Sequence, residues 1–184
     1  GTFKLAVEIC EEAWAAQSSS QDHVNSGCEL ILNPSASHFS LRKIRTRERL
    51  VSHWSRALKA HYCYTNLVGL EAGRIVYDGG SIFAESGEIV GRGPRFVFGD
   101  GELTFRDLDI DLARSLKLAT ESYAEDNHVP SSTCVVASPV HSAENPEINQ
   151  NFKTTKNEQL EGQEIENPDQ SQEKYLEFSR AVSL

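Results

Sequence analysis

Two short apolar segments, followed by one long stretch with helical spacing, most strongly constrain what this chain can fold into. Phe3–Ile9 and Glu29–Asn33 have the length and apolar content of buried strands. Between Ile44 and Tyr62 the apolar side chains recur every three or four residues, which predicts a helix with one stripe facing the core. Strands combined with such a helix predict an α/β fold.

The spacing of apolar residues changes after Tyr62. Three segments rich in β-branched and aromatic residues and punctuated by glycine predict further strands: Tyr62–Leu70, Ile75–Ala84 and Gly87–Phe98. Leu103–Ile110 alternates apolar and polar residues, as a half-buried strand does, and Ala113–Glu125 suits a short helix.

The composition divides the chain into three parts. We expect residues 1–128 to form the folded domain. Residues 129–184 contain nine acidic and four basic side chains, and Asn, Gln, Glu and Ser dominate 138–172. Such a stretch buries too little apolar surface to offset its ordering entropy, so 129–172 is predicted to be a flexible acidic linker. Residues 173–184 are amphipathic again and predict the start of a helix that leads into a further domain.

Charge and composition exclude several classes of protein. The formal net charge of −9 argues against non-specific binding to nucleic acid or to an anionic membrane, and no apolar run is long enough to span a membrane. The four cysteines form no CxxC pair and the six histidines no HExxH motif, so neither a disulfide scaffold nor a metal site is predicted. These features favour a reducing, cytoplasmic setting. The absence of methionine suggests a processed chain or a piece of a longer one.

Cys10 is the sharpest candidate for chemistry. It follows the first predicted strand, where a thiol can project to the carboxyl edge of a sheet, and open α/β sheets place their sites at that edge. A nucleophilic thiol also needs a partner that takes its proton. Without such a partner, Cys10 has the alternative reading of a small buried apolar residue, which is common for free cysteines.

The segment EICEEAW, Glu8–Trp14, resembles the nucleophile motif of nitrilase-superfamily carbon–nitrogen hydrolases, and most closely the glutaminase domain of glutamine-dependent NAD synthetases. Further stretches agree with that domain in order and spacing: LILNPSASHFSLRK (Leu30–Lys43), YTNLVGLEAGRIVYDGGSIFAESGEIVGRGPRF (Tyr64–Phe96) and DLDIDLAR (Asp107–Arg114). The final EKYLEFSRAVSL resembles the helix that opens the synthetase domain.

The resemblance implies a reaction and its participants. A cysteine thiolate attacks the side-chain amide of glutamine, ammonia leaves, and water hydrolyses the glutamyl thioester. Ammonia then amidates deamido-NAD in a second domain that requires ATP and magnesium. Glutamine, deamido-NAD and ATP are thus the expected partners. The intact parent is expected to be a homo-oligomer.

The resemblance also assigns glutamine binding to Ser37 and Lys43. A hydroxyl can pair with either end of the amino-acid group, and an ammonium can neutralise its carboxylate. Without the resemblance, Ser37 would be a turn serine. Lys43 would then belong to a solvated basic helix start, in a run of Arg42, Lys43, Arg45, Arg47 and Arg49. Asp78-Gly79-Gly80-Ser81 is predicted to be a turn that shapes the pocket wall, and Trp14 to pack near the site.

The chain also departs from the family's pattern. The family's general-base glutamate and catalytic lysine lie far upstream of the cysteine, whereas nine residues precede Cys10, and Glu8 and Lys4 within the strand do not suit those roles. The resemblance therefore implies the C-terminal half of a nitrilase-type α-β-β-α sandwich, and we expect these 184 residues alone to be inactive. A stand-alone amidase of the same superfamily and a non-catalytic fragment that binds a partner are the alternatives.

Overall fold

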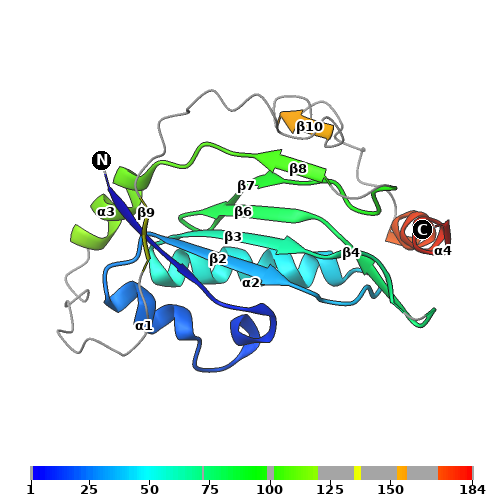
Figure 1. Cartoon of the computed structure of the whole chain (residues 1–184), viewed down its shortest axis with the longest axis horizontal. Helices are drawn as coiled ribbons and strands as arrows, with labels where there is room; N and C mark the ends of the chain where they lie inside the picture. The colour runs from blue at the N-terminus through cyan, green and yellow to red at the C-terminus, as the bar shows by residue number, and fades with distance from the viewer. Residues whose placement is uncertain are drawn as a thin grey trace.

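The computed structural model describes residues 2–71, 73–98, 102–119, 135–137, 153–156 and 170–183. Its centre is a mixed six-stranded sheet with the order β7-β6-β3-β2-β1-β9 (Figure 1). The strands of this sheet are β1 (Phe3–Val7), β2 (Leu30–Ser35), β3 (His61–Asn66), β6 (Ser81–Glu85), β7 (Glu88–Arg92) and β9 (Val135–Ala137). The α/β class predicted from the sequence is confirmed.

Strand direction decides where the connecting loops meet. β1, β2 and β3 run parallel, with Val7 opposite Leu32 and Leu32 opposite Cys63. β6 and β7 follow as antiparallel neighbours, and β9 pairs antiparallel with β1. The carboxyl ends of the three parallel strands therefore lie at one edge of the sheet. The segments that follow β1 and β2 contain the residues singled out as candidates for chemistry.

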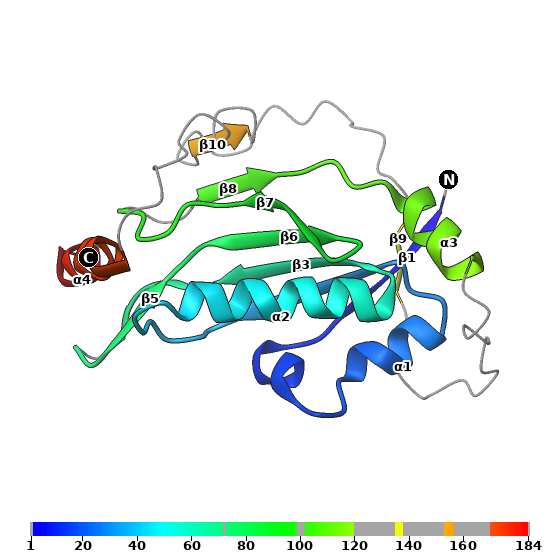
Figure 2. The same ribbon diagram turned by 180° about the vertical axis from the view of Figure 1, so that it is seen from behind.

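One face of the sheet packs against α2 (Lys43–Leu58), which Figure 2 shows in front of β3 and β6. Side chains alternate along each strand, so every second residue points to this helix. On β3 these residues are Tyr62 and Tyr64, both buried. The core they join contains Ala6, Val24, Cys28, Ile31, Val51, Leu58, Ala60, Ile82 and Ala84.

The opposite face of the sheet is more open. A groove of about 360 Å³ crosses it, lined by the alternate residues of the same strands and by β8 (Glu102–Phe105). Its apolar lining includes Val7, Leu32, Cys63, Phe83 and Leu103. The other described strands form two smaller sheets: β4 (Val68–Glu71) pairs with β5 (Ile75–Asp78), and β8 pairs with β10 (Lys153–Lys156).

The remaining elements are short. A 3-10 turn, η1 (Cys10–Trp14), and α1 (Ser19–Asn25) join β1 to β2, α3 (Ile110–Leu118) follows β8, and α4 (Gln170–Ser183) lies near the end of the chain. No helix in the part of the chain that the structure describes is long and apolar enough to cross a membrane.

Three boundaries differ from those predicted by the pattern. β2 continues through Pro34, which was expected to end it. β8 ends at Phe105, and the predicted strand over Leu103–Ile110 was too long because Asp109 begins α3. The predicted segment Ile75–Ala84 contains two strands, β5 and β6, which lie in different sheets and are separated at the expected turn by Gly79 and Gly80, with positive φ values of 71° and 91°.

The predicted linker falls mostly outside the described residues, which within 129–172 comprise β9, β10 and the first residues of α4. α4 itself begins at Gln170, a few residues before the amphipathic pattern that predicted a helix.

Candidate functional site

Cys10 lies at the start of η1, directly beyond the carboxyl end of β1. Its backbone has a φ of 51°, in the left-handed region that residues other than glycine rarely adopt. Such a conformation persists only when the surroundings hold it, and it is common at active sites. The Cys10 side chain is half-buried and forms no disulfide. The expected placement of this thiol, at the carboxyl edge of the sheet after a strand, is what the structure has.

The carboxylate of Glu8, two residues before Cys10, is buried in the core. Glu8 is fully buried and accepts hydrogen bonds from the hydroxyls of Ser18 at 2.8 Å, Ser20 at 2.5 Å and Tyr62. On the far side of the turn, the indole N–H of Trp54 donates to the carbonyl of Ala13 at 2.8 Å. Three hydroxyl donors in the core thus hold the carboxylate of Glu8. Lys4 donates to the carbonyl of Ser26.

The loop after β2 carries Ser37, whose backbone is fixed on both sides by one amide side chain. Asn66, at the end of β3, accepts from the Ser37 N–H at 2.8 Å and donates to the Ser37 carbonyl at 3.0 Å. The same Asn66 oxygen accepts from the hydroxyl of Tyr64 at 3.3 Å. The pKa of Tyr64 is raised by burial, and the Arg47 guanidinium and the hydroxyls of Ser35 and Ser37 partly oppose this rise. Ser37 is therefore rigidly placed.

Lys43 is the first residue of α2 and is half-buried. Its ammonium donates to the carbonyl of His38 at 2.9 Å, which folds the side chain back over the loop. Burial lowers the pKa of Lys43, as does the positive charge of Arg47, while Asp78 and Cys10 act in the opposite direction. Cys10 and Lys43 are placed by neighbouring parallel strands, since Cys10 follows β1 and Lys43 begins the helix after β2.

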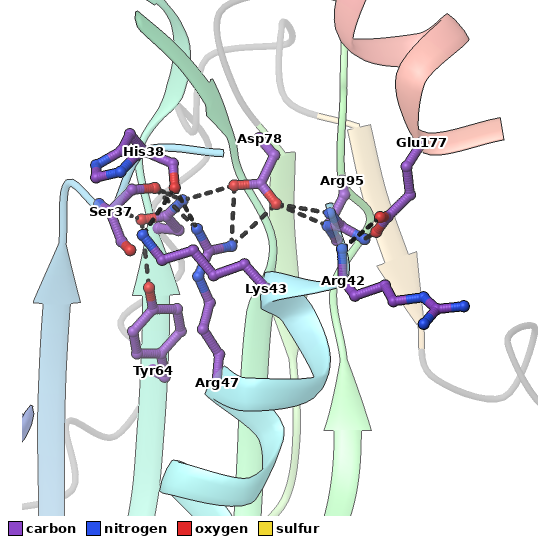
Figure 3. A network of polar contacts seen from close by, with 10 residues as sticks. Ser37, His38, Arg42, Lys43, Arg47, Tyr64, Asp78, Arg95 and Glu177 are labelled. Atoms are coloured by element: carbon purple, nitrogen blue, oxygen red, sulfur yellow. Dashed lines mark hydrogen bonds and ion pairs between the residues drawn. The ribbon is translucent and has the colours of Figure 1, made fainter. Parts of the chain in front are cut away.

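Beneath the loop lies a buried ionic network, shown in Figure 3. Arg47 and Asp78 have fully buried side chains, and Arg47 donates to both carboxylate oxygens of Asp78 at 2.9 Å. A second nitrogen of Arg47 donates to the carbonyl of Ser37 at 2.8 Å. Asp78 also accepts from Arg95 at 2.8 Å and from Asn66 at 3.2 Å. The candidate loop thus sits on charged groups that are each compensated.

This network corrects two expectations. Arg47 was grouped with a basic run that could be a solvated face, yet it is fully buried, whereas Arg45 and Arg49 are exposed. Asp78 does begin the turn Asp78-Gly79-Gly80-Ser81, as expected, but its carboxylate also holds the loop. Trp14, expected to pack near the site, is 40% exposed, and Trp54 makes the contact to the turn.

The missed residues are Arg47 and Asn66. Arg47 could have been found from its spacing, because it lies four residues before Val51 and thus on the same helix face as the core. Asn66 gives no comparable signal, since its position at the end of β3 becomes visible only in the fold.

The other cysteines and the metal ligands give no second site among the described residues. Cys63 lies in the groove on the open face, where burial raises its pKa to about 12, and Cys28 is buried in the core. Across the described part of the chain, no group of three or more His, Cys, Asp or Glu side chains is arranged to hold a metal ion.

Comparison with known sequences identifies relatives. No protein-family profile matches the chain. A putative glutamine-dependent NAD⁺ synthetase of Schizosaccharomyces pombe is 34% identical over 113 residues, which is 61% of this chain and 16% of that protein. The mouse glutamine-dependent NAD⁺ synthetase is 36% identical over 115 residues, 62% of this chain and 16% of its own length. The chain thus spans about a sixth of the length of these relatives.

Comparison with solved structures concerns the fold alone. A carbon–nitrogen hydrolase from Helicobacter pylori G27 superimposes with a TM-score of 0.50 at 16% identity, over 68% of this chain and 46% of that one. The mixed α/β fold is therefore shared with this carbon–nitrogen hydrolase. Over about two thirds of its length, the chain is a partial match to the nitrilase-type domain of glutamine-dependent NAD synthetases.

Proposed function

We propose that this chain is the cysteine-bearing part of a glutaminase domain that supplies ammonia to an NAD synthetase. In this account the Cys10 thiolate attacks the side-chain amide carbon of glutamine and the C–N bond breaks. Ammonia leaves with a proton from the site, and water then hydrolyses the thioester to glutamate. The ammonia is used in an ATP- and magnesium-dependent amidation of deamido-NAD by a synthetase domain of the same protein.

One observation supports the proposal most directly. Cys10 has a strained backbone at the carboxyl edge of the sheet after β1, and Lys43 begins the helix after the neighbouring parallel strand β2. A thiol and an ammonium on the segments that follow neighbouring strands suit a substrate with an amide at one end and a carboxylate at the other. Ser37 lies on the loop between β2 and Lys43, and Asn66 and Arg47 hold its backbone.

The proposed roles then divide between bond breaking and binding. Cys10 is the catalytic residue, and Ser37 and Lys43 bind the amino-acid end of glutamine. The relatives favour a synthetase over a stand-alone amidase, because identity to NAD synthetases exceeds 30% and identity to the Helicobacter hydrolase is 16%. The part of this proposal that the chain itself can test is glutamine binding next to Cys10.

Substrate protection tests the binding half of this proposal on the chain itself. Iodoacetamide is added at pH 8 with and without L-glutamine, and the carboxamidomethylation rate of each cysteine peptide is followed by mass spectrometry. We expect glutamine to slow labelling of Cys10 and to leave Cys63 unchanged, since Cys63 lies on the other face of the sheet.

Two controls make the result specific. Lys43→Ala is expected to weaken the protection, whereas Arg49→Ala, which removes an exposed cation further along the same helix, is expected to leave it unchanged. Equal Cys10 labelling with and without glutamine, up to the solubility limit of glutamine, would count against a glutamine site here.

A further inference from the structure

Helix α4 contacts the domain through acidic side chains instead of apolar ones. Glu177 is buried, and Glu173 forms an ion pair with Arg45 at 2.6 Å. The apolar residues Tyr175 and Phe178 are 74% and 60% exposed. An amphipathic helix normally turns its apolar stripe to the core. α4 is therefore held to the domain by specific polar contacts.

Glu177 makes the central contact. Its carboxylate accepts from Arg95 at 2.7 Å and from the backbone N–H of Arg42 at 2.8 Å, although Arg42 lies 135 residues earlier in the chain. Figure 3 shows Glu177 descending from α4 to Arg95, on the opposite side of Asp78 from Arg47. Charge-assisted hydrogen bonds of this kind are about twice as strong as neutral ones.

Arg42 is the residue directly before Lys43, and its backbone is strained. Its φ of 63° places it in the left-handed region immediately before α2 begins. A residue other than glycine holds that conformation only where its surroundings fix it. The carboxylate of Glu177 fixes the N–H of this residue, so the turn that presents Lys43 depends on a contact from α4.

Glu177 is also linked, through other charged side chains, to Ser37, the other candidate binding residue. Arg95 joins Glu177 to Asp78, Asp78 binds Arg47, and Arg47 holds the carbonyl of Ser37 at 2.8 Å. One carboxylate on α4 thus touches the turn before Lys43 directly and the Ser37 loop through three buried or half-buried charged groups.

We propose that Glu177 is a positioning residue for the amino-acid-binding part of the candidate site, so that docking of α4 sets the geometry of Lys43 and Ser37. The inference rests on the proposed function for its ligand, glutamine. It assigns to a helix outside the main sheet a role that no motif around Cys10, Ser37 or Lys43 contains.

The first arm of the test measures the contact and needs no ligand. Hydrogen exchange of backbone amides is compared in the full chain and in Glu177→Ala. We expect the Arg42 amide to exchange about tenfold faster in the variant, because the carboxylate that accepts this N–H at 2.8 Å is removed. Lys174→Ala, an exposed change on the same helix, is the matched control and is expected to leave Arg42 unchanged.

Amides of β3 report whether the core is intact. If Glu177→Ala also accelerates exchange of the β3 amides, the variant Glu177→Gln decides between a loosened core and the loss of one contact. It keeps an oxygen for the Arg42 N–H but loses the charge facing Arg95, and it is expected to give an intermediate rate at Arg42 with β3 unchanged. An Arg42 amide that exchanges at the same rate in all three chains overturns the positioning role.

The second arm measures the consequence for glutamine by the Cys10 protection assay. We expect the glutamine concentration for half-protection to rise about tenfold in Glu177→Ala, with the labelling rate of Cys10 in the absence of glutamine unchanged. A purely structural role of Glu177 would alter both the half-protection concentration and the labelling rate of Cys10 without glutamine, or neither. Faster Arg42 exchange with an unchanged half-protection concentration overturns the coupling to the site. If glutamine fails to protect Cys10 even in the unaltered chain, the proposed function fails, and the exchange arm still decides whether Glu177 fixes the turn.

Discussion

At the scale of single residues, the carboxylate of Asp78 is the group on which the buried ionic network converges. This carboxylate faces the guanidinium groups of Arg47 and Arg95 and also accepts from Asn66. Burying a charged group costs several kcal/mol, which is recovered only when every partner is present. Removing one member leaves an uncompensated charge in the core.

Asp78→Asn is therefore expected to be strongly destabilising. It keeps the shape of the side chain but leaves Arg47 buried without its counter-charge, which typically costs about 3–5 kcal/mol of unfolding free energy. Urea denaturation measures the change. Asp111→Asn is the control, because Asp111 pairs with Arg114 at a site where its side chain is 85% exposed, and it is expected to cost less than about 1 kcal/mol. A similar small loss for Asp78→Asn would show that the network is not needed for the fold.

Lys43 is proposed to act in glutamine binding and not in bond breaking. Its proposed contact is with a carboxylate remote from the scissile amide, so it stabilises ground state and transition state alike. In the proposed full-length synthetase, Lys43→Ala is expected to raise KM for glutamine about tenfold or more and to change kcat much less. Steady-state kinetics with Arg49→Ala as control checks this. A fall in kcat at unchanged KM would assign Lys43 a part in the chemistry.

The sequence predicted some of these residues and not others. The Cys10 and Ser37 positions followed from motifs, and Lys43 from its place after the same loop. Arg47 was misjudged because a cation in a basic run usually faces solvent, although its spacing from Val51 marks the core face of α2. The partner that makes its burial favourable, Asp78, lies 31 positions away and has no local pattern.

At the scale of elements, β3 concentrates groups whose charged forms are disfavoured. Burial is the largest cause for each: it raises the pKa of Tyr62, of Tyr64 and of Cys63, the last to about 12. In the unfolded chain these groups ionise near their ordinary values of 10.0 for tyrosine and 9.0 for cysteine. The folded state therefore binds these protons more tightly. The stability that these three groups contribute to the folded state is fully present below pH 9 and is lost as the pH rises.

The chain is thus expected to lose stability on the alkaline side. Each raised group lowers the unfolding free energy by up to about 1.4 kcal/mol per pH unit above its unfolded pKa. Urea midpoints should be nearly constant from pH 7 to 8.5 as far as these groups are concerned and fall from about pH 9 upward. Cys63→Ala should fall less steeply between about pH 9 and 10.5. An equally steep fall in that variant would show that Cys63 is ionised as easily in the fold as outside it.

Element boundaries show where local patterns fail. Pro34 was expected to stop β2, but β1 pairs with β2 only as far as Leu32, so no ladder bond to β1 is required at the proline. Asp109 ends the extended segment after β8 because its carboxylate accepts from the N–H groups of Asp111 and Leu112 and starts α3. The end of β2 thus depends on a neighbouring strand. The start of α3 depends on a capping residue, Asp109, which lay within the alternating pattern of Leu103–Ile110.

At the scale of the whole molecule, the site is assembled from segments that are distant in sequence. Cys10 follows β1, Lys43 begins α2, and Glu177 comes from α4, 135 residues beyond Arg42. The strand and helix patterns predicted the α/β class, since each depends on nearby residues. They could not predict the contact of α4 with the domain, because that contact is polar and leaves the apolar residues of the helix exposed.

The central claim is that Cys10 is the nucleophile that releases ammonia from glutamine. It is tested most directly by NAD formation in the proposed full-length synthetase, measured with glutamine and separately with ammonium chloride as the nitrogen source. For Cys10→Ala we predict loss of at least about a thousandfold in the glutamine-dependent rate, with the ammonia-dependent rate nearly unchanged, because only the nucleophile is removed. A Cys10→Ala protein that still forms NAD from glutamine at a comparable rate would contradict the account.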